Sequence, residues 1–220
     1  RCICNAHEGR SDRRMECRYS GNAFCASLSA EDKARLCALC HIKRYAKGQC
    51  LRESYWDNCI SLVLDGMALK LEQQDTNKKP LPSGLGSAGI FFNLNEVFRT
   101  GEARGASDSR DTLCLTDCAI AVFGLAEFRA LMRSRPSFTA ALLQNCVMRR
   151  LPEEEAMLRS LGFGDAEESV RYILEYQRAH DIPYLTHEQI ALVCNRSRQT
   201  VTTVMRQLLD KDPELFGENF

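Results

Sequence analysis

The chain has 220 residues, 45% of them hydrophobic and 26% charged, and its 29 basic and 29 acidic side chains give a formal net charge of zero. This length and composition fit one medium and one small globular domain and exclude a disordered or fibrous chain. No run of roughly eighteen apolar residues exists and no signal peptide opens the chain, so we expect a cytoplasmic protein without a membrane span.

One helix is predicted near the N-terminus, between Ser29 and His41. Ser29 is typical of a helix N-cap, and Leu36, Leu39 and Cys40 would share one face of the helix that it starts. The residues before Ser29 show no periodic pattern, and we expect them to be irregular.

The middle of the chain, up to about Ile120, is expected to be rich in β-strands. Apolar and polar residues alternate at 60–64 and at 67–71, as they do in strands with one buried face. Residues 77–89 are instead rich in Lys, Pro, Gly and Ser and are predicted to form a loop. A short helix is expected at 125–132.

A long helix is predicted over Ser137–Leu161, where apolar residues recur at helical spacings. Pro152 lacks a backbone donor and its ring clashes with the preceding turn, so we expect the helix to kink or break there. The segment Gly162–Asp165 is a candidate hinge, because glycine permits unusual dihedral angles and Asp165 can cap the next helix.

Residues 184–208 have the pattern of a helix-turn-helix. Thr186 and Gln189 predict a capping box, Asn195 tolerates the left-handed conformation of a sharp turn, and Ser197 can cap a second helix. The apolar residues that would pack the two helices together are Ile190, Ala191, Cys194, Val201, Val204 and Leu208. An ordinary helical hairpin is the alternative, since periodicity alone does not separate the two.

The side chains left exposed around the second helix suit nucleic-acid recognition. Arg and Gln match base edges in the major groove, while Ser and Thr hydroxyls suit phosphates or bases. The candidate DNA-binding residues are Thr186, His187, Arg196, Ser197, Arg198, Gln199, Thr202, Thr203 and Arg206. From Ala166 onward six basic side chains stand against nine acidic ones, so any positive surface must be local.

This segment closely resembles the DNA-binding domain of the cyclic-AMP receptor protein and fumarate-nitrate reduction regulator (CRP/FNR) superfamily of bacterial transcription factors. The matching pattern is Leu185–Thr186 before the first helix and Ser197–Val201 at the start of the second. Further segments resemble the family's β-roll and the helix after it, so the resemblance covers roughly residues 20–210 with gaps; these segments are 24–29, 45–49, 62–69, 117–122 and 127–131.

The resemblance implies an α+β fold in three parts. Residues 1–135 would form a cupin-like β-roll sensor domain, similar to a cyclic-nucleotide-binding domain, that includes the cysteine-containing N-terminal segment. Residues 136–163 would form a dimerisation helix, and residues 164–220 the helix-turn-helix domain. Family members usually add a β-hairpin wing, but the segment after Leu209 is acidic and short, so we expect the wing to be reduced or absent.

The resemblance also implies which bases are read. In the receptor-protein pattern an Arg, a Glu and an Arg contact bases; Arg198 matches the first, Gln199 stands for the Glu and Thr203 for the second Arg. Gln can bond adenine bidentately and the Thr methyl suits thymine, so we expect a half-site richer in A·T, with Arg198 on a guanine.

Cyclic AMP is not expected as the effector. Members that bind it carry a Gly-Glu loop and an Arg-Ser pair around the cyclic phosphate and ribose. In the corresponding stretch, Gly86–Glu96, the Glu after Gly is missing, and the Arg-Ser pair cannot be placed in 104–107 or 110–112. The signal is therefore left open.

The twelve cysteines are the other unusual feature. Cys2, Cys4, Cys17 and Cys25 are candidate ligands for an iron–sulfur cluster or zinc. Cys25 matches the last of the three N-terminal ligands of the fumarate-nitrate regulator, but Cys17 is spaced differently and the distal position falls on Ala121. A cluster, a zinc site, a thiol–disulfide switch and no cofactor all remain open.

The remaining cysteines are expected to act mainly as small core hydrophobes. Cys37 and Cys40 form a Cys-x-x-Cys pattern that is weak evidence of a site by itself. The others in this group are Cys50, Cys59, Cys114, Cys118, Cys146 and Cys194.

These patterns together predict a non-enzymatic, homodimeric transcription regulator. It would read a palindromic operator in double-stranded DNA, with half-sites about one helical turn apart, and act with RNA polymerase. A redox- or metal-sensing adaptor of the same fold without DNA binding is the alternative. A thiol oxidoreductase is a weaker one, because no Cys-x-x-Cys precedes a βαβ pattern.

Overall fold

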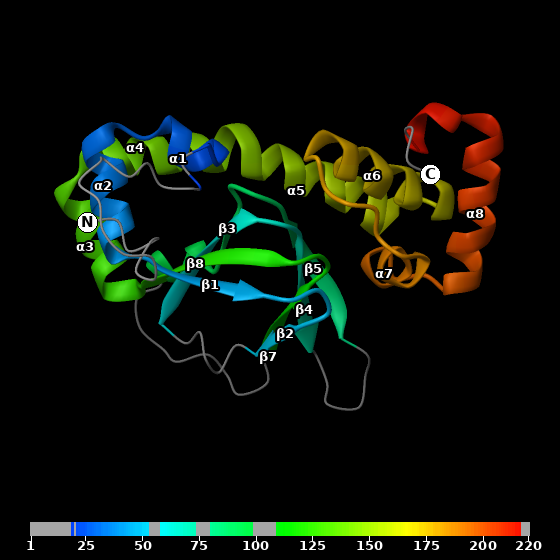
Figure 1. The fold of residues 1–220 in the computed structure, drawn as a ribbon, viewed down its shortest axis with the longest axis horizontal. Helices are drawn as coiled ribbons and strands as arrows, with labels where there is room; N and C mark the ends of the chain where they lie inside the picture. The colour runs from blue at the N-terminus through cyan, green and yellow to red at the C-terminus, as the bar shows by residue number, and fades with distance from the viewer. Residues whose placement is uncertain (1–18, 20, 53–57, 74–79, 99–108, 217–220) are drawn as a thin grey trace, which may run out of the picture.

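The computed structural model describes residue 19 and residues 21–52, 58–73, 80–98 and 109–216. Its strands form a β-roll, along which a long helix extends toward a group of C-terminal helices (Figure 1). None of the helices in this part of the chain combines the length and the apolar character that a membrane crossing requires.

The roll consists of two four-stranded antiparallel sheets. The first contains, in order, β1 (His41–Tyr45), β8 (Cys118–Gly124), β3 (Cys59–Asp65) and β6 (Phe91–Phe92). The second contains β2 (Cys50–Arg52), β7 (Ser109–Cys114), β4 (Ala68–Gln73) and β5 (Leu81–Gly86). A short 3₁₀ helix, Leu94–Val97, follows β6. The strand-rich region expected up to Ile120 is therefore present.

Gly66 connects the two sheets. β3 and β4 follow one another in the chain but lie in different sheets, so the glycine turn joins layers rather than a hairpin. Gly66 has a φ of +83°, and a Cβ there would meet the Asp117 carbonyl oxygen at 2.2 Å. Only glycine fits both the dihedral angle and the space.

β5 corrects one prediction from sequence. Residues 81–86 form a strand, although the composition of 77–89 predicted a loop. β5 pairs only with β4 and lies at a sheet edge, where the missing N–H of Pro82 costs no ladder hydrogen bond. The register shifts between Lys70 and Leu71 opposite it. The loop prediction is wrong for β5, and residues 77–79 lie outside the described residues.

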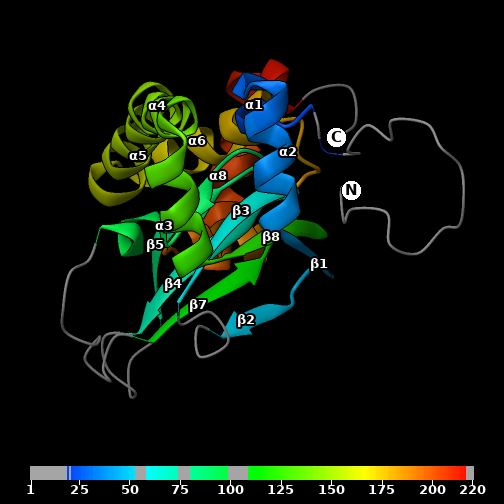
Figure 2. The ribbon, with the colours of Figure 1, turned by 90° about the vertical axis from the view of Figure 1, so that its left-hand side faces the viewer.

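Helices α1 (Ala23–Ser27), α2 (Ala30–Leu39) and α3 (Leu125–Ser134) pack at one end of the roll (Figure 2). The predicted cap of α2 is confirmed, because the Ser29 hydroxyl accepts the Asp32 N–H at 3.1 Å. The Asp32 carboxylate in turn accepts from Arg135 Nε at 2.8 Å and from the Ser137 hydroxyl at 2.7 Å. These bonds attach α2 to the start of the long helix.

Five phenylalanines form the centre of this end of the core. Their ring centroids lie between 4.8 and 6.1 Å from one another along a chain of mostly edge-to-face contacts. They come from α1, β6, β8, α3 and the long helix, and are Phe24, Phe91, Phe123, Phe128 and Phe138. The aromatic core therefore unites the roll with the helices around it.

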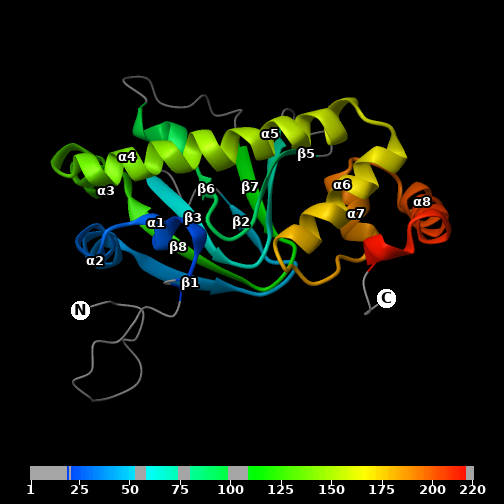
Figure 3. The same cartoon turned by 90° about the horizontal axis from the view of Figure 1, so that it is seen from above.

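The long helix forms one rod with two changes of hydrogen bonding. It consists of α4 (Pro136–Asn145), a π-helical segment (Cys146–Arg150), α5 (Leu151–Met157) and a second π-helical segment (Leu158–Phe163). Pro152 is the second residue of α5, in the first turn after the π segment, where its missing donor is tolerated. As the sequence predicted, a change of helix occurs at this proline: Pro152 lies in the first turn of α5 with Glu153 and Glu154 after it, although the rod itself continues past it (Figure 3).

We expect Phe128→Ala to lower the free energy of unfolding by about 3–5 kcal/mol, because it removes a fully buried ring from the aromatic core. Denaturant titration followed by circular dichroism measures this. Phe98 is 62% exposed, and Phe98→Ala should change stability by no more than about 0.5 kcal/mol. Equal losses in the two variants would contradict the central role of the aromatic core.

Candidate nucleic-acid interface

The first helix of the predicted helix-turn-helix is α7 (His187–Val193). The Thr186 hydroxyl accepts the Gln189 N–H, and the Gln189 carboxamide oxygen accepts the Thr186 N–H at 2.9 Å. Two backbone donors that a helix start leaves free are thus bonded by side chains. The predicted capping box is confirmed, and it fixes the residue at which α7 begins.

The second helix is α8 (Arg198–Lys211). Asn195, in the turn before it, has a φ of +50°, the left-handed conformation that the sequence predicted. The Ser197 hydroxyl accepts the Thr200 N–H at 3.0 Å and caps the helix. The turn and both caps therefore set the angle between α7 and α8 through local bonds.

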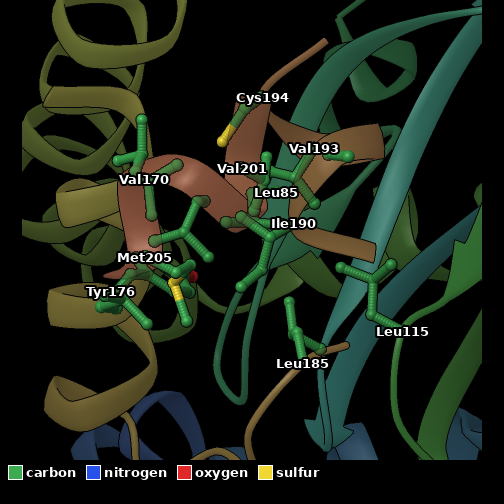
Figure 4. Close-up of a cluster of buried hydrophobic side chains, with 14 of the residues drawn as sticks. Leu85, Leu115, Val170, Tyr176, Leu185, Ile190, Val193, Cys194, Val201 and Met205 are labelled. Atoms are coloured by element: carbon green, nitrogen blue, oxygen red, sulfur yellow. The ribbon is translucent and has the colours of Figure 1, made fainter. Parts of the chain in front are cut away.

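One face of each helix is buried, as predicted. All six apolar positions named from sequence are at most 7% exposed, and Figure 4 shows several of them pointing into a common cluster. Cys194 is among them, and burial raises the pKa of its thiol to about 12, so it stays protonated. It packs as a small hydrophobe.

The opposite face of α8 carries the polar candidates. Arg198, Gln199, Thr203 and Arg206 are exposed, and α8 lies at the far end of the molecule from α1–α3 (Figure 1). Thr202 is half-buried, and its hydroxyl hydrogen bonds to His187 Nδ1 of α7 at 2.9 Å. These four candidates give the free surface of α8 two guanidinium groups, one amide and one hydroxyl.

Three further candidates also have structural roles. The Thr186 and Ser197 hydroxyls are the helix caps, so their oxygens already accept backbone N–H groups. Arg196 donates from Nη2 to the Gly164 carbonyl at 3.0 Å, which ties the turn of the helix-turn-helix to the segment that leads into α6 (Ala166–Ala179). Asp165 starts α6 with a capping box, as predicted.

Acidic side chains lie at the other end of α8 from Arg198. Lys211 pairs with Glu167 at 2.9 Å, and Arg171 with Asp212 at 2.7 Å. A helix of 14 residues is about 21 Å long, so these carboxylates are well separated from Arg198. Two carboxylates of the acidic C-terminal segment are thus paired with basic side chains near the end of α8 remote from Arg198.

The C-terminal helices share their core with the roll, which sequence reasoning missed. The cluster drawn in Figure 4 joins Leu85 and Leu115 of the roll to Leu185, Ile190 and other residues of the helices. The Gln189 amide donates to the Leu115 carbonyl oxygen. No local pattern predicted this contact, because it joins positions 74 residues apart in the chain.

A polar junction connects the roll, the rod and α6. Arg149 donates from Nη2 to the Ala88 carbonyl at 2.8 Å and from Nε to Glu153 at 3.1 Å. A Cβ at Gly89 would meet Arg149 Nη1 at 2.3 Å, so this guanidinium needs glycine beside it. His180 Nε2 of α6 lies 3.9 Å from the Glu153 carboxylate.

Tyr176 makes a second bond across the same junction. Its hydroxyl donates to Ser87 Oγ at 3.0 Å, and its ring packs against His180 with a centroid distance of 4.3 Å. Burial raises the pKa of Tyr176 to about 12, so the phenol keeps its proton and remains a donor. The position of the C-terminal helices relative to the roll is therefore fixed by specific polar bonds as well as by apolar packing.

A cavity of about 320 Å³ lies between the roll and the rod. Phe91, Asn93 and Asn95, from the stretch compared with the cyclic-AMP loop, line it together with Lys70 and Arg150. Lys70 donates to Asn93 at 3.0 Å and Arg150 pairs with Glu154 at 2.6 Å. The cavity thus holds basic groups, both already bonded to protein partners.

The cysteines proposed as metal ligands are only partly described. Cys2, Cys4 and Cys17 lie outside the described residues, and Cys25 is buried in α1 against the aromatic core. Among the residues that the structure describes, no three His, Cys, Asp or Glu side chains are grouped to hold a metal ion. The predicted cluster or zinc site stays a prediction.

No protein-family model matches the chain, and no curated protein matches its sequence. Several solved structures, in contrast, match the fold of the chain. The c-di-GMP responsive global regulator CLP of Xanthomonas campestris is 16% identical over 83% of this chain and 93% of its own, with a TM-score of 0.59. FixK2 of Bradyrhizobium japonicum is 14% identical over 78% of this chain and 85% of its own, with a TM-score of 0.57.

A third similar structure, from Eubacterium rectale, is described as a transcriptional regulator of the CRP/FNR family. It is 11% identical over 86% of this chain and 87% of its own, with a TM-score of 0.57. Such low identity shows the fold alone. The chain has a CRP/FNR-like fold, with a β-roll and a C-terminal helical domain, as the sequence resemblance predicted.

We expect acidification to destabilise the polar junction through His180. Burial lowers the pKa of this imidazole, with the Arg149 charge acting in the same direction and Glu153 opposing it. The unfolded chain takes up a proton below about pH 6.5, whereas the folded chain resists it, so stability falls as the pH drops through that value. Thermal unfolding at pH 7.5 and 5.5 measures the loss.

His180→Gln should lose less stability than the wild type over that pH interval. His41→Gln is the matched control, because His41 is exposed on β1, and it should keep the wild-type pH dependence. A His180→Gln variant with an unchanged pH dependence would show that this imidazole is not the titrating group.

Proposed function

We propose that the protein is a one-component bacterial transcription regulator that binds double-stranded DNA in a sequence-specific manner. The observation that carries this proposal is the exposed polar face of α8, which is held on a rigid, doubly capped frame. A helix of this kind can enter the major groove with its N-terminal residues against base edges. As such a regulator the protein would act in the cytoplasm, where it would bind the DNA and act with RNA polymerase.

The candidate residues on and around α8 would contact different parts of the DNA. Arg198 and Gln199 are at the N-terminal end of the helix, where side chains reach base edges, and Thr203 follows one turn later. Arg206 and Arg196 would contact phosphates. The segments around Thr186 and Ser197 would lie against the sugar-phosphate backbone of the DNA and position the protein on the duplex. Thr202 and His187 support each other through their hydrogen bond and would act from the rim of the interface.

The protein would act as a homodimer through the long rod. Five apolar side chains on α4, α5 and the π segments are between 50% and 72% exposed, at positions that recur along the helix: Leu143, Val147, Met148, Leu151 and Leu158. An exposed apolar stripe on a helix is expected to be covered by a partner. A second copy of the rod, related by a two-fold axis, supplies a stripe of the same kind.

The two-fold axis supports reading of a palindromic operator. Two copies of α8 would enter successive major grooves, with half-sites about one helical turn apart. The local basic groups are few, so specific contacts rather than phosphate neutralisation would dominate the affinity. A signal at the roll could alter the spacing of the reading helices, since roll and helices share one core.

Arg198→Ala should weaken binding to an operator selected from random duplexes by roughly 1–3 kcal/mol, because it removes a bidentate base contact. Fluorescence anisotropy with the labelled operator measures the change. Arg133→Ala removes the same charge from an exposed site on α3 and should leave the affinity unaltered. Equal affinities for wild type and Arg198→Ala would contradict this assignment, and no binding by the wild type to any duplex would favour the adaptor alternative.

Introducing carboxylates into the apolar stripe should dissociate the dimer. Met148 and Leu151 are 72% and 50% exposed, so the double variant M148E/L151E can fold while a charge is placed in the proposed interface. Light scattering after size exclusion should give the 24.9 kDa of one chain instead of twice that mass. Leu209→Glu, at a 41% exposed site on α8, should remain dimeric. A dimeric double variant would refute the rod interface.

A further inference from the structure

Two buried cysteines stand at the two ends of the turn that joins β7 to β8. Cys114 ends β7 and is 0% exposed, and Cys118 begins β8 and is 5% exposed. Both pack in one apolar cluster of the roll, and the neighbouring Cys118 thiol, together with burial, raises the pKa of the Cys114 thiol. The two sulfurs are therefore already neighbours, with only three residues between them in the chain.

The Cys118 sulfur is held in a fixed place. It lies 3.3 Å from the Met67 carbonyl oxygen and 4.0 Å from the Thr116 hydroxyl. A Cβ at Gly66 would meet this sulfur at 2.9 Å, so the glycine between the sheets also makes room for the thiol. Such a position limits the sulfur's rotation and keeps it beside Cys114.

Cys118 lines a surface cavity of the roll. The cavity has a volume of about 370 Å³, and its walls include Arg44, Tyr45, Asp65 and Asp117. A small molecule in this cavity would meet Cys118, whereas Cys114 is not among the residues that line it. This is the arrangement of a reacting thiol with a second thiol in position to resolve it.

The turn between the two thiols also contacts α7 directly. The Leu115 carbonyl oxygen accepts the Gln189 amide of α7. The Leu115 side chain is 0% exposed and belongs to the same apolar cluster as Leu185 and Ile190. A change in the shape of this turn would therefore act directly on the helix-turn-helix.

We propose that Cys118 and Cys114 form a hydroperoxide-sensitive thiol pair whose oxidation loosens α7 from the roll. The Cys118 sulfur, as thiolate, attacks one peroxide oxygen; the O–O bond breaks, and the other oxygen leaves and takes up a proton as water or an alcohol. Cys118 is then a sulfenic acid. The Cys114 sulfur attacks the Cys118 sulfur, its proton leaves with the hydroxyl as a second water, and the disulfide forms.

Two thiols thus give two electrons to one hydroperoxide, and a dithiol reductant reverses the change. Covalently bonded sulfurs lie closer than two thiols in van der Waals contact, so the disulfide must pull the ends of the Leu115–Asp117 turn together. The Leu115 carbonyl then moves away from Gln189. As regulation of DNA reading this inference rests on the proposed function, whereas the thiol chemistry does not.

Mass spectrometry of the full chain tests the chemistry. Reduced protein is treated with hydrogen peroxide, alkylated and digested with trypsin, which leaves both cysteines on the peptide Asp111–Arg129. We expect this peptide to lose two hydrogens, to resist alkylation, and to regain both thiols with dithiothreitol. In Cys114→Ser, a dimedone adduct should instead accumulate on Cys118. Cys146→Ser, which alters a half-buried thiol of the rod, should behave as the wild type.

Full alkylation of both thiols after peroxide treatment, or oxidation of Cys118 to a sulfinic acid without a disulfide, would overturn the proposed pair. Hydrogen exchange tests the link to α7: amides at 187–193 should exchange roughly fivefold faster or more after oxidation, as expected for the loss of about one net hydrogen bond. Cys114→Ser should show no such change. A disulfide without faster exchange would overturn the regulatory link, and a failed Arg198→Ala test would affect only the DNA-binding proposal.

Discussion

The packing of α7 against the turn at Leu115 is the contact on which the arrangement of the molecule depends. Leu115, Leu185 and Ile190 are nearly inaccessible to solvent, and each contributes about 1.5–3 kcal/mol by leaving water. Their cluster belongs to the roll and to the C-terminal helices at once. The C-terminal helices therefore do not pack as a unit that is independent of the roll. A movement of the turn at Leu115 would displace them as well.

The exposure of the polar face of α8 follows from the same contact. α7 occupies the side that faces the roll, so α8 is displaced to the end of the molecule, with its apolar residues turned inward (Figure 3). The local caps at Thr186 and Ser197 keep the angle between the helices without using the exposed face. The buried contacts and the proposed reading surface thus lie on opposite sides of one small frame.

The rod combines three functions along its length. Its first turns carry Phe138 into the aromatic core, and its middle carries Arg149 to the roll and Glu153 toward α6. Its outer side leaves an apolar stripe open. A signal in the cavity beside Arg150 and the proposed dimer contact would both act on this helix, which is the physical basis for coupling between them.

The sequence by itself determined the elements whose causes are local. The caps at Ser29, Asp165, Thr186 and Ser197, and the left-handed turn at Asn195, depend on a few adjacent residues and were predicted correctly. The tertiary structure alone decided that 81–86 is a strand, that the rod continues past the change of helix at Pro152, and that Gln189 bonds to Leu115. Each of these depends on a partner strand, a changed helical turn or a contact far along the chain, and none of these leaves a periodic pattern in the residues that it joins.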